Sequence, residues 1–181
     1  MKELSLNILD IVENSVNASA KNIDIVIEES AREDTLVIKI NDDGRGMDES
    51  VLKSVRDPFM TTKSSKKVGL GVSLLNASAQ MCDGRLDVAS SPGKGTNICA
   101  VFKNSHLDRP PLGDISGTLV AVMAMHPGIN ISYCHKINDK IFAVNTSSLR
   151  ELMSPLPLNN PAVLKGIEEY IKSNLENLKE G

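Results

Sequence analysis

Apolar residues recur along the chain with two periods that predict different elements. Between residues 5 and 20 they lie three or four positions apart, which predicts an amphipathic helix. Between residues 22 and 28 isoleucine occupies every second position, which predicts a strand with one buried face. The helix positions are Leu6, Leu9, Val12, Val16 and Ala20, and the strand positions are Ile23, Ile25 and Ile27.

The same two patterns predict the remaining elements and a fold class. Strands are expected over 35–40, 85–90, 96–102, 129–135 and 140–145, and helices over 48–55, 72–81, 114–125, 147–153 and 160–179. Tight turns join neighbouring strands, which favours an antiparallel or mixed sheet covered by helices on one face. The expected fold class is therefore α+β, an α/β sandwich.

A proline-containing segment predicts a division of the chain. Residues 104–113 include Pro110 and Pro111 and follow a predicted strand, so we expect a linker there. Residues 1–103 would then form one domain. Residues 114–181 would form a small α/β appendage at the C-terminal side, and their pattern assigns them no role.

Composition and charge exclude several classes of protein. The 181 residues are 41% hydrophobic and carry a formal net charge of −3, so a packed core is expected and a nucleic-acid-binding surface is not. No apolar run reaches the roughly 20 residues that span a bilayer, and residues 1–10 do not resemble a signal peptide. A cytoplasmic protein is therefore expected. Its three cysteines and three histidines are scattered and fit neither a disulfide framework nor a zinc site.

Polar side chains gather on one face of the first predicted helix. Asp10, Asn14 and Asn17 are spaced three and four positions apart, so they project from the same face. Carboxylate and amide oxygens are ligands for Mg²⁺, which prefers to share its coordination with phosphates. The alternative interpretation is a solvated polar stripe.

A glycine-containing motif follows the second predicted strand. Gly44 and Gly46 allow the backbone to approach a ligand closely. Asp42 precedes them at the strand end, where a carboxylate can accept a hydrogen bond from the exocyclic amine of adenine. The alternative interpretation is a plain turn.

A second glycine motif opens the helix predicted over 72–81. The free N–H groups and the dipole at such a helix start favour an anion near Gly69, Leu70 and Gly71. Thr62 and Lys63, in the polar segment just upstream, add donors and positive charge for phosphates. The alternative interpretation is a flexible loop before a core helix.

These motifs, in this order, resemble those of the GHKL (Bergerat-fold) ATPase and kinase superfamily. Residues 9–24 resemble the N box of mismatch-repair ATPases, and residues 42–47 resemble their G1 box. Residues 57–63 and 69–72 are similar to the lid and the following glycine box of histidine kinases of the nitrogen-sensor type, and residues 84–96 continue that similarity. The resemblance covers about residues 5 to 103.

The resemblance implies ATP and Mg²⁺ as cofactors. Asn14 would ligate Mg²⁺, and Asp42 would bind adenine with Gly46 and Thr96 nearby. Lys63 and the backbone of residues 69–72 would hold the phosphates under a closing lid. The candidate cofactor-binding residues are Asn14, Asn17, Ala18, Asp42, Gly44, Gly46, Met47, Thr62, Lys63, Gly69, Leu70, Gly71, Val72 and Thr96.

The chain departs from the family pattern at two places. Asp10, the candidate catalytic residue, stands where the family usually has a glutamate, and its side chain is one methylene shorter. The N box begins near residue 5, so no upstream helical hairpin with a phosphoacceptor histidine is expected. Residues 108–118 and 157–161 resemble small stand-alone ATP-binding proteins encoded near iron hydrogenases.

Three functions are compatible with these observations. The first is a histidine-kinase-like protein that transfers the γ-phosphoryl group of ATP to a partner protein in signalling. The second is a non-enzymatic switch, in which ATP orders residues 56–68 and the C-terminal appendage binds a partner or forms a homodimer. The third is a slow ATPase in DNA metabolism. The net negative charge and the lack of a basic stripe argue against this third function.

Overall fold

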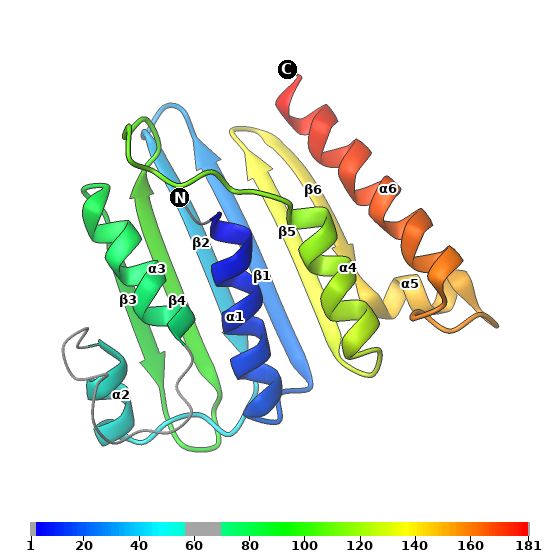
Figure 1. Ribbon diagram of the computed structural model, residues 1–181, viewed down its shortest axis with the longest axis horizontal. Coiled ribbons are helices and arrows are strands. Elements are labelled where there is room, and N and C mark those ends of the chain that lie inside the picture. The colour runs from blue at the N-terminus through cyan, green and yellow to red at the C-terminus, as the bar shows by residue number, and fades with distance from the viewer. Residues whose placement is uncertain (1–2, 57–69, 181) are drawn as a thin grey trace.

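The computed structural model describes residues 3–56 and 70–180, and these form a sheet with helices packed on it (Figure 1). Helices and strands appear in nearly the positions that the sequence pattern predicts. The helices are α1 (Leu4–Asn17), α2 (Glu49–Arg56), α3 (Leu70–Met81), α4 (Ile115–Met125), α5 (Thr146–Met153) and α6 (Pro161–Lys179), and the strands are β1 (Asn22–Ser30), β2 (Thr35–Asp42), β3 (Arg85–Ser90), β4 (Thr96–Lys103), β5 (Asn130–Ile137) and β6 (Lys140–Asn145).

The six strands form one mixed sheet in the order β3-β4-β2-β1-β5-β6. All neighbouring pairs are antiparallel except β1 and β5, which are parallel with Ile23 opposite Ile131. The predicted α+β class with a mixed sheet is thus confirmed. The strands of the C-terminal residues extend this same sheet, so the expectation of a separate appendage is not confirmed.

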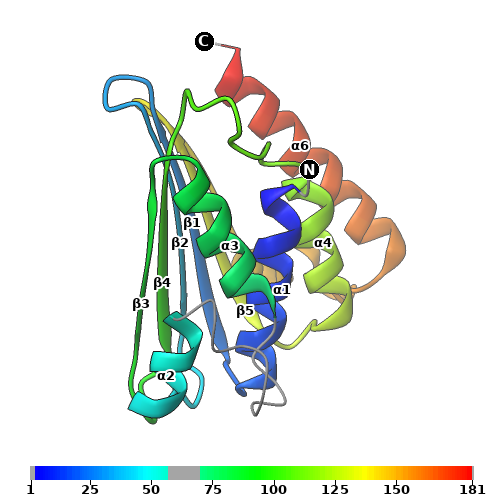
Figure 2. The same ribbon diagram turned by 60° about the vertical axis from the view of Figure 1, so that its left-hand side comes forward.

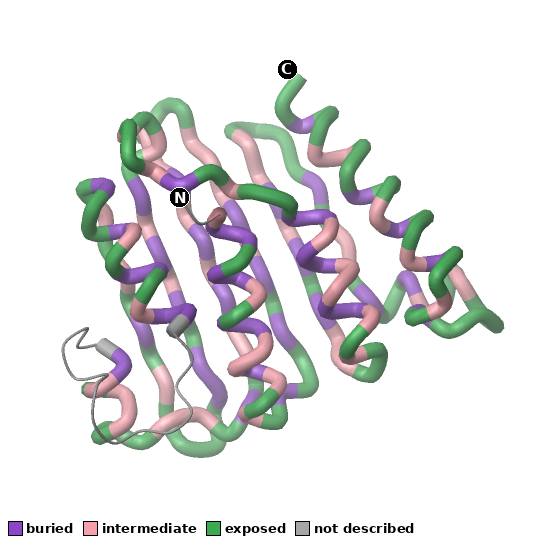
Figure 3. Tube along the Cα trace, viewed as in Figure 1, coloured by how far each residue is buried: buried purple, intermediate pink, exposed green. Residues whose placement is uncertain are grey.

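Helices α3, α1 and α4 lie side by side over one face of the sheet, and α6 packs next to α4 (Figures 1 and 2). Strand alternation explains why this face is covered: Ile23, Ile25 and Ile27 of β1 are buried beneath the helices. The residues between them belong to the opposite face and are more exposed (Figure 3). The apolar period of two therefore buries one face of the sheet.

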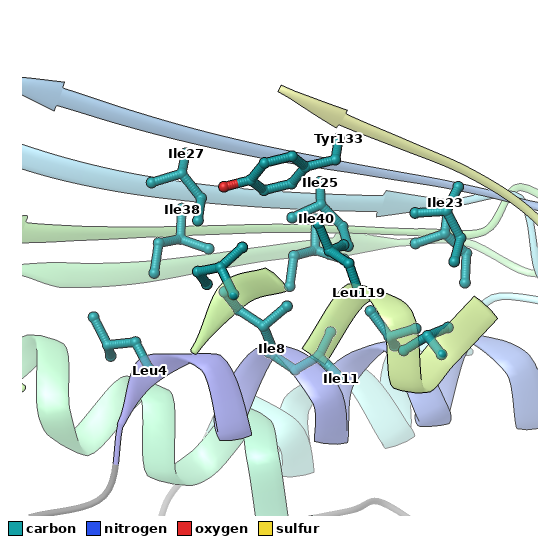
Figure 4. Close-up of a cluster of buried hydrophobic side chains, with 14 of the residues drawn as sticks. Leu4, Ile8, Ile11, Ile23, Ile25, Ile27, Ile38, Ile40, Leu119 and Tyr133 are labelled. Carbon is teal, nitrogen blue, oxygen red and sulfur yellow. The ribbon is translucent and has the colours of Figure 1, made fainter. Parts of the chain in front are cut away.

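The core is built from the apolar stripe of α1 and the inward residues of the strands. Ile8 and Ile11 of α1 point toward Ile25 and Ile40 of the sheet, and all four are at most 2% exposed (Figure 4). Removing this much apolar surface from water holds α1 firmly against the strands. The rigid core fixes the polar residues at the end of α1 relative to the ends of β2 and β4.

Several chain segments meet at one end of the sheet, shown at the bottom of Figure 1. The last turn of α1, the last residue of β2 and the first residue of β4 lie at this end. Helix α3 begins further up, beside the middle of α1. We call it the α1–β2–β4 end. The opposite end carries the β1–β2 turn and the segment that follows β4.

Candidate functional site

Asp42 lies at the centre of the α1–β2–β4 end. It is the last residue of β2, and its register partner in β4 is Thr96. Ser15 of α1 donates its hydroxyl to Asp42 Oδ2 at 2.7 Å, and the Gly44 N–H donates to Asp42 Oδ1 at 2.9 Å. The two bonds fix the plane of a half-buried carboxylate between α1 and the loop that follows β2. Each oxygen keeps a further lone pair for a ligand donor.

Two glycines let the backbones around Asp42 approach closely. A Cβ atom on Gly95, whose φ is +74°, would lie 1.8 Å from the Asp42 carbonyl oxygen. A Cβ atom on Gly44 would lie 2.9 Å from the carbonyl oxygen of Ala18. Both positions must therefore be glycine for these segments to meet, and for Gly44 this gives the predicted glycine motif a steric cause.

Ser90, Thr96 and Met47 form a second group beside the carboxylate. Ser90 Oγ donates to the Gly95 carbonyl oxygen at 2.7 Å and accepts from the Met47 N–H at 2.9 Å. It also lies 3.2 Å from Thr96 Oγ1. These bonds fix the 91–95 turn against the loop after β2, so the predicted residues Met47 and Thr96 are brought to the same place as Asp42.

The polar face of α1 borders this group. Asp10 and Asn17 are exposed, and Asn14 between them is half-buried. The Asn14 Nδ2 atom is buried and has no hydrogen-bond partner among the described residues. Burying an amide without a partner costs about 1–3 kcal/mol, so this side chain is the kind of group that a ligand would satisfy.

The first turn of α3 closes the other side of α1. A Cβ atom on Gly71 would lie 2.6 Å from the Asp10 Cβ atom, so the glycine allows α3 to begin directly beside Asp10. The Val72 side chain is buried in the core, which leaves its backbone as the part able to meet a ligand. Leu70 is the first residue of α3. The predicted residues Thr62, Lys63 and Gly69 lie outside the described residues.

The loop after β2 is tied down by a second carboxylate, Asp43. Its Oδ1 accepts from the N–H groups of Lys21 and Asn22 at 2.7 and 2.9 Å, and its Oδ2 accepts from Asn22 Nδ2 at 2.6 Å. Hydrogen bonds from the Asn22 backbone and side chain hold the pKa of Asp43 below its usual value. Asp43 is therefore an anionic anchor for the segment that carries Asp42, Gly44 and Gly46.

The residues present fit Mg²⁺ and ATP. Within residues 3–56 and 70–180, no three His, Cys, Asp or Glu side chains gather as a metal cluster. Mg²⁺ often takes one or two protein oxygens and completes its shell with phosphates and water, which matches Asn14 as a protein ligand. The Asn14 Nδ2 atom, which has no partner among the described residues, could donate to a phosphate oxygen, and the glycines beside Asp42 let the backbone approach a ligand closely.

Two residues of this site were not predicted from the sequence. Ser15 and Ser90 are the hydroxyl groups that position Asp42 and Met47. A signal for Ser15 exists, because it lies four residues after Ile11 on the apolar side of α1 and is 3% exposed. A hydroxyl on an apolar stripe needs a partner, and the partner here is a carboxylate from another element.

A family model described as "Histidine kinase-, DNA gyrase B-, and HSP90-like ATPase" matches residues 2–106. A sensor protein of Shewanella frigidimarina is 30% identical over 109 residues, 59% of this chain and 17% of that protein. The sensor protein kinase FleS of Pseudomonas aeruginosa is 34% identical over 108 residues, 60% of this chain and 26% of that protein. The signal transduction histidine-protein kinase AtoS of Escherichia coli is 36% identical over 103 residues, 56% and 16% of the two chains.

A solved structure shares the fold. The crystal structure of the N-terminal domain of a DNA repair protein matches with a TM-score of 0.52 at 16% sequence identity, covering 80% of this chain and 52% of that one. In the described part of the chain, no helix is both long enough and apolar enough to cross a membrane. With the family match extending over residues 2–106, the chain belongs to the histidine kinase-, DNA gyrase B- and HSP90-like ATPases.

Proposed function

We propose that this protein binds ATP with Mg²⁺ at the α1–β2–β4 end and transfers the γ-phosphoryl group to a partner protein. The observation that carries the proposal is the buried Asn14 Nδ2 atom, which has no hydrogen-bond partner among the described residues. It lies one helical turn from Asp10 and near a carboxylate fixed for an amine donor. The similarity to sensor kinases supports the reaction class.

Asp42 would recognise the adenine base. Its carboxylate is held by Ser15 and Gly44 and can accept a hydrogen bond from the exocyclic amine. Because the acceptor is fixed before the ligand arrives, little ordering entropy is lost on binding. Thr96 lies opposite Asp42 in the register and would contribute its hydroxyl on the same side.

Asn14 would hold Mg²⁺ together with the phosphates. The metal, when bound, neutralises charge that builds up on the transferring phosphoryl group. The chain's own contribution is positioning: Asn14 is carried by a helix whose opposite face is packed in the core.

Asp10 would act on the incoming acceptor. It is exposed on α1, next to Gly71 in the first turn of α3. It would orient the acceptor group and take its proton as the new bond to phosphorus forms, while the bond between the β- and γ-phosphates breaks and ADP leaves. The shorter reach of aspartate compared with glutamate disfavours activation of water and is compatible with an acceptor brought by a partner.

The test is transfer of label from γ-labelled ATP with Mg²⁺ to added proteins of the native host. Wild type should label a discrete acceptor polypeptide, and Asp10→Asn should reduce the initial rate by about 100-fold while ATP affinity stays within about twofold. Phosphate release to water without protein label would contradict transfer and support an ATPase. ATP binding with neither label nor release would contradict it and support a switch.

A further inference from the structure

A single arginine of the C-terminal region connects several backbone segments at the α1–β2–β4 end. Arg150 of α5 donates from Nε and Nη2 to the Pro127 carbonyl oxygen at 3.1 and 3.0 Å. Its Nη2 also donates to the Ile129 carbonyl oxygen, and its Nη1 donates to Asn130 Oδ1 at 2.7 Å. The planar fork of one guanidinium thus holds both the 126–129 turn and the first residue of β5.

One chain of hydrogen bonds leads from Arg150 to the loop after β2. Asn130 Nδ2 donates to Asn22 Oδ1 at 3.0 Å, and Asn22 Nδ2 donates to Asp43 Oδ2 at 2.6 Å. Asp43 is the anchor of the loop and directly follows Asp42. In each of these two asparagines the side-chain oxygen accepts one hydrogen bond and the NH₂ group donates another. Because an amide oxygen can only accept and an amide NH₂ group can only donate, the orientation of one side chain fixes that of the next.

A second connection leads from Arg150 to the polar face of α1. The arginine fixes the Pro127 carbonyl, and the preceding residue, His126, places its Nε2 2.9 Å from Glu13 Oε1. Glu13 precedes Asn14 in α1. This connection adds a polar restraint, at the residue next to Asn14, to the rotation of α1 that the core already sets.

We infer that Arg150 is a positioning residue for the nucleotide site and acts through the two hydrogen-bonded connections just described, which we call its two arms. It sets Asp42 by way of Asn130, Asn22 and Asp43, and it sets Asn14 by way of His126 and Glu13. The inference rests on the proposed ATP binding and adds that residues beyond the family match take part in it. The C-terminal strands and α5 then hold the site in its binding geometry.

The chain contains a matched arginine for comparison. Arg109 also donates to backbone carbonyls, from Nε to Asn104 at 2.8 Å and from Nη1 to Pro110 at 3.2 Å, and it too is half-buried. It follows the end of β4 that lies away from Thr96. Arg109→Ala therefore removes similar bonds of similar burial without touching either arm.

The experiment compares ATP affinity, in the presence of Mg²⁺ and at a temperature where each variant is folded. We expect Arg150→Ala to weaken binding about 5- to 20-fold and Arg150→Lys to weaken it less, because lysine keeps the charge and loses the fork. Arg109→Ala should change affinity less than about twofold, although its melting temperature falls comparably.

Variants that break one arm at a time distinguish an effect on the position of the site residues from an effect on overall stability. Asn130→Ala and His126→Ala should each weaken ATP binding about threefold, and their double variant should approach Arg150→Ala. Adding Asn130→Ala to Arg150→Ala should change affinity little, since that arm is already broken. If the losses of ATP affinity caused by Asn130→Ala and Arg150→Ala add up in the double variant, the inference is wrong.

The outcomes keep this inference apart from the proposed function. If wild type fails to bind ATP, the proposed function fails. If wild type binds ATP and Arg150→Ala binds equally well, or lowers only the melting temperature as Arg109→Ala does, then Arg150 has a structural role and the inference is wrong.

Discussion

Two polar clusters lie at opposite ends of the sheet, and they differ in how completely their hydrogen bonds are made. At the α1–β2–β4 end, Asn14 buries an amide nitrogen with no partner among the described residues. At the other end, His135 is 2% exposed and both its ring nitrogens are paired. Its Nδ1 lies 2.9 Å from the Tyr133 hydroxyl, and its Nε2 lies 2.8 Å from Glu29 Oε1.

We call Tyr133, His135 and Glu29 the closed cluster, and the residues around Asn14 and Asp42 the open cluster. The pKa shifts in the closed cluster agree with its complete hydrogen bonding. Burial raises the pKa of Tyr133 far above its usual range, so the phenol stays neutral. The hydrogen bond from His135 lowers the pKa of Glu29 below its ordinary value of 4.5, although burial acts in the opposite direction. A cluster whose members satisfy one another stabilises the join between β1 and β5, whereas the open cluster keeps groups for a ligand.

The largest effect is expected where backbone contact shapes the open cluster. Gly95→Ala places a Cβ atom 1.8 Å from the Asp42 carbonyl oxygen, so the free energy of unfolding should fall by at least about 3 kcal/mol. Gly93→Ala is the matched control, since its φ is +75° and its Cβ meets nothing within 4 Å. It should cost about 1 kcal/mol in a denaturant titration. Equal costs would refute the close-approach argument.

Breaking the closed cluster should affect stability and leave binding alone. His135→Ala leaves the Tyr133 hydroxyl and the Glu29 carboxylate without their partner, which should cost about 2–4 kcal/mol of unfolding free energy. ATP affinity of the folded variant should stay within about twofold of wild type. A tenfold loss of affinity would show that this cluster also serves the nucleotide site.

Removing the Asn14 amide should have the opposite effect to His135→Ala: ATP affinity should fall and stability should be kept. Asn14→Ala deletes a buried donor that has no partner among the described residues, so the unfolding free energy without nucleotide should stay the same or rise by up to about 1 kcal/mol. Affinity for ATP with Mg²⁺ should fall about 10- to 30-fold, and affinity in chelator should change little. A large loss of stability would mean that Asn14 has a structural role.

The smallest effect is a dependence of stability on pH. The pKa of Glu29 is lowered by folding, so the stability that it contributes is present above its unfolded value of 4.5 and is lost as pH falls through the folded value. Thermal unfolding between pH 6 and pH 3 should show this loss, and Glu29→Gln should show less of it. Identical pH profiles for both proteins would contradict the assignment.

Local patterns predicted the elements and most of the described site. The alternation of Ile23, Ile25 and Ile27 predicts β1, and the glycines around Asp42 predict a close backbone approach. These features depend on neighbours in the sequence, so they can be recognised without the fold. The order of the N box, G1 box and later glycine box then pointed to the family that residues 2–106 match.

Long-range pairing was beyond such patterns. The hairpin of β5 and β6 was predicted, but its parallel pairing with β1 joins residues more than a hundred positions apart. The contacts of His135 with Glu29 and of Asn130 with Asn22 follow from that pairing. For the same reason the strands of the predicted appendage extend the sheet, whereas residues 104–113 lie outside it. The resemblance of residues 108–118 and 157–161 to proteins encoded near iron hydrogenases stays an expectation from the sequence.

The central claim is that the open cluster is an ATP site, and calorimetric titration of ATP with Mg²⁺ into wild type and Asp42→Asn tests it most directly. Wild type should bind ATP saturably, and the variant should lose at least about 100-fold in affinity, because its amide can present a donor to the adenine amine. The two proteins should melt within a few degrees of each other without nucleotide. No binding by wild type, or equal affinities of the two proteins, would contradict the account.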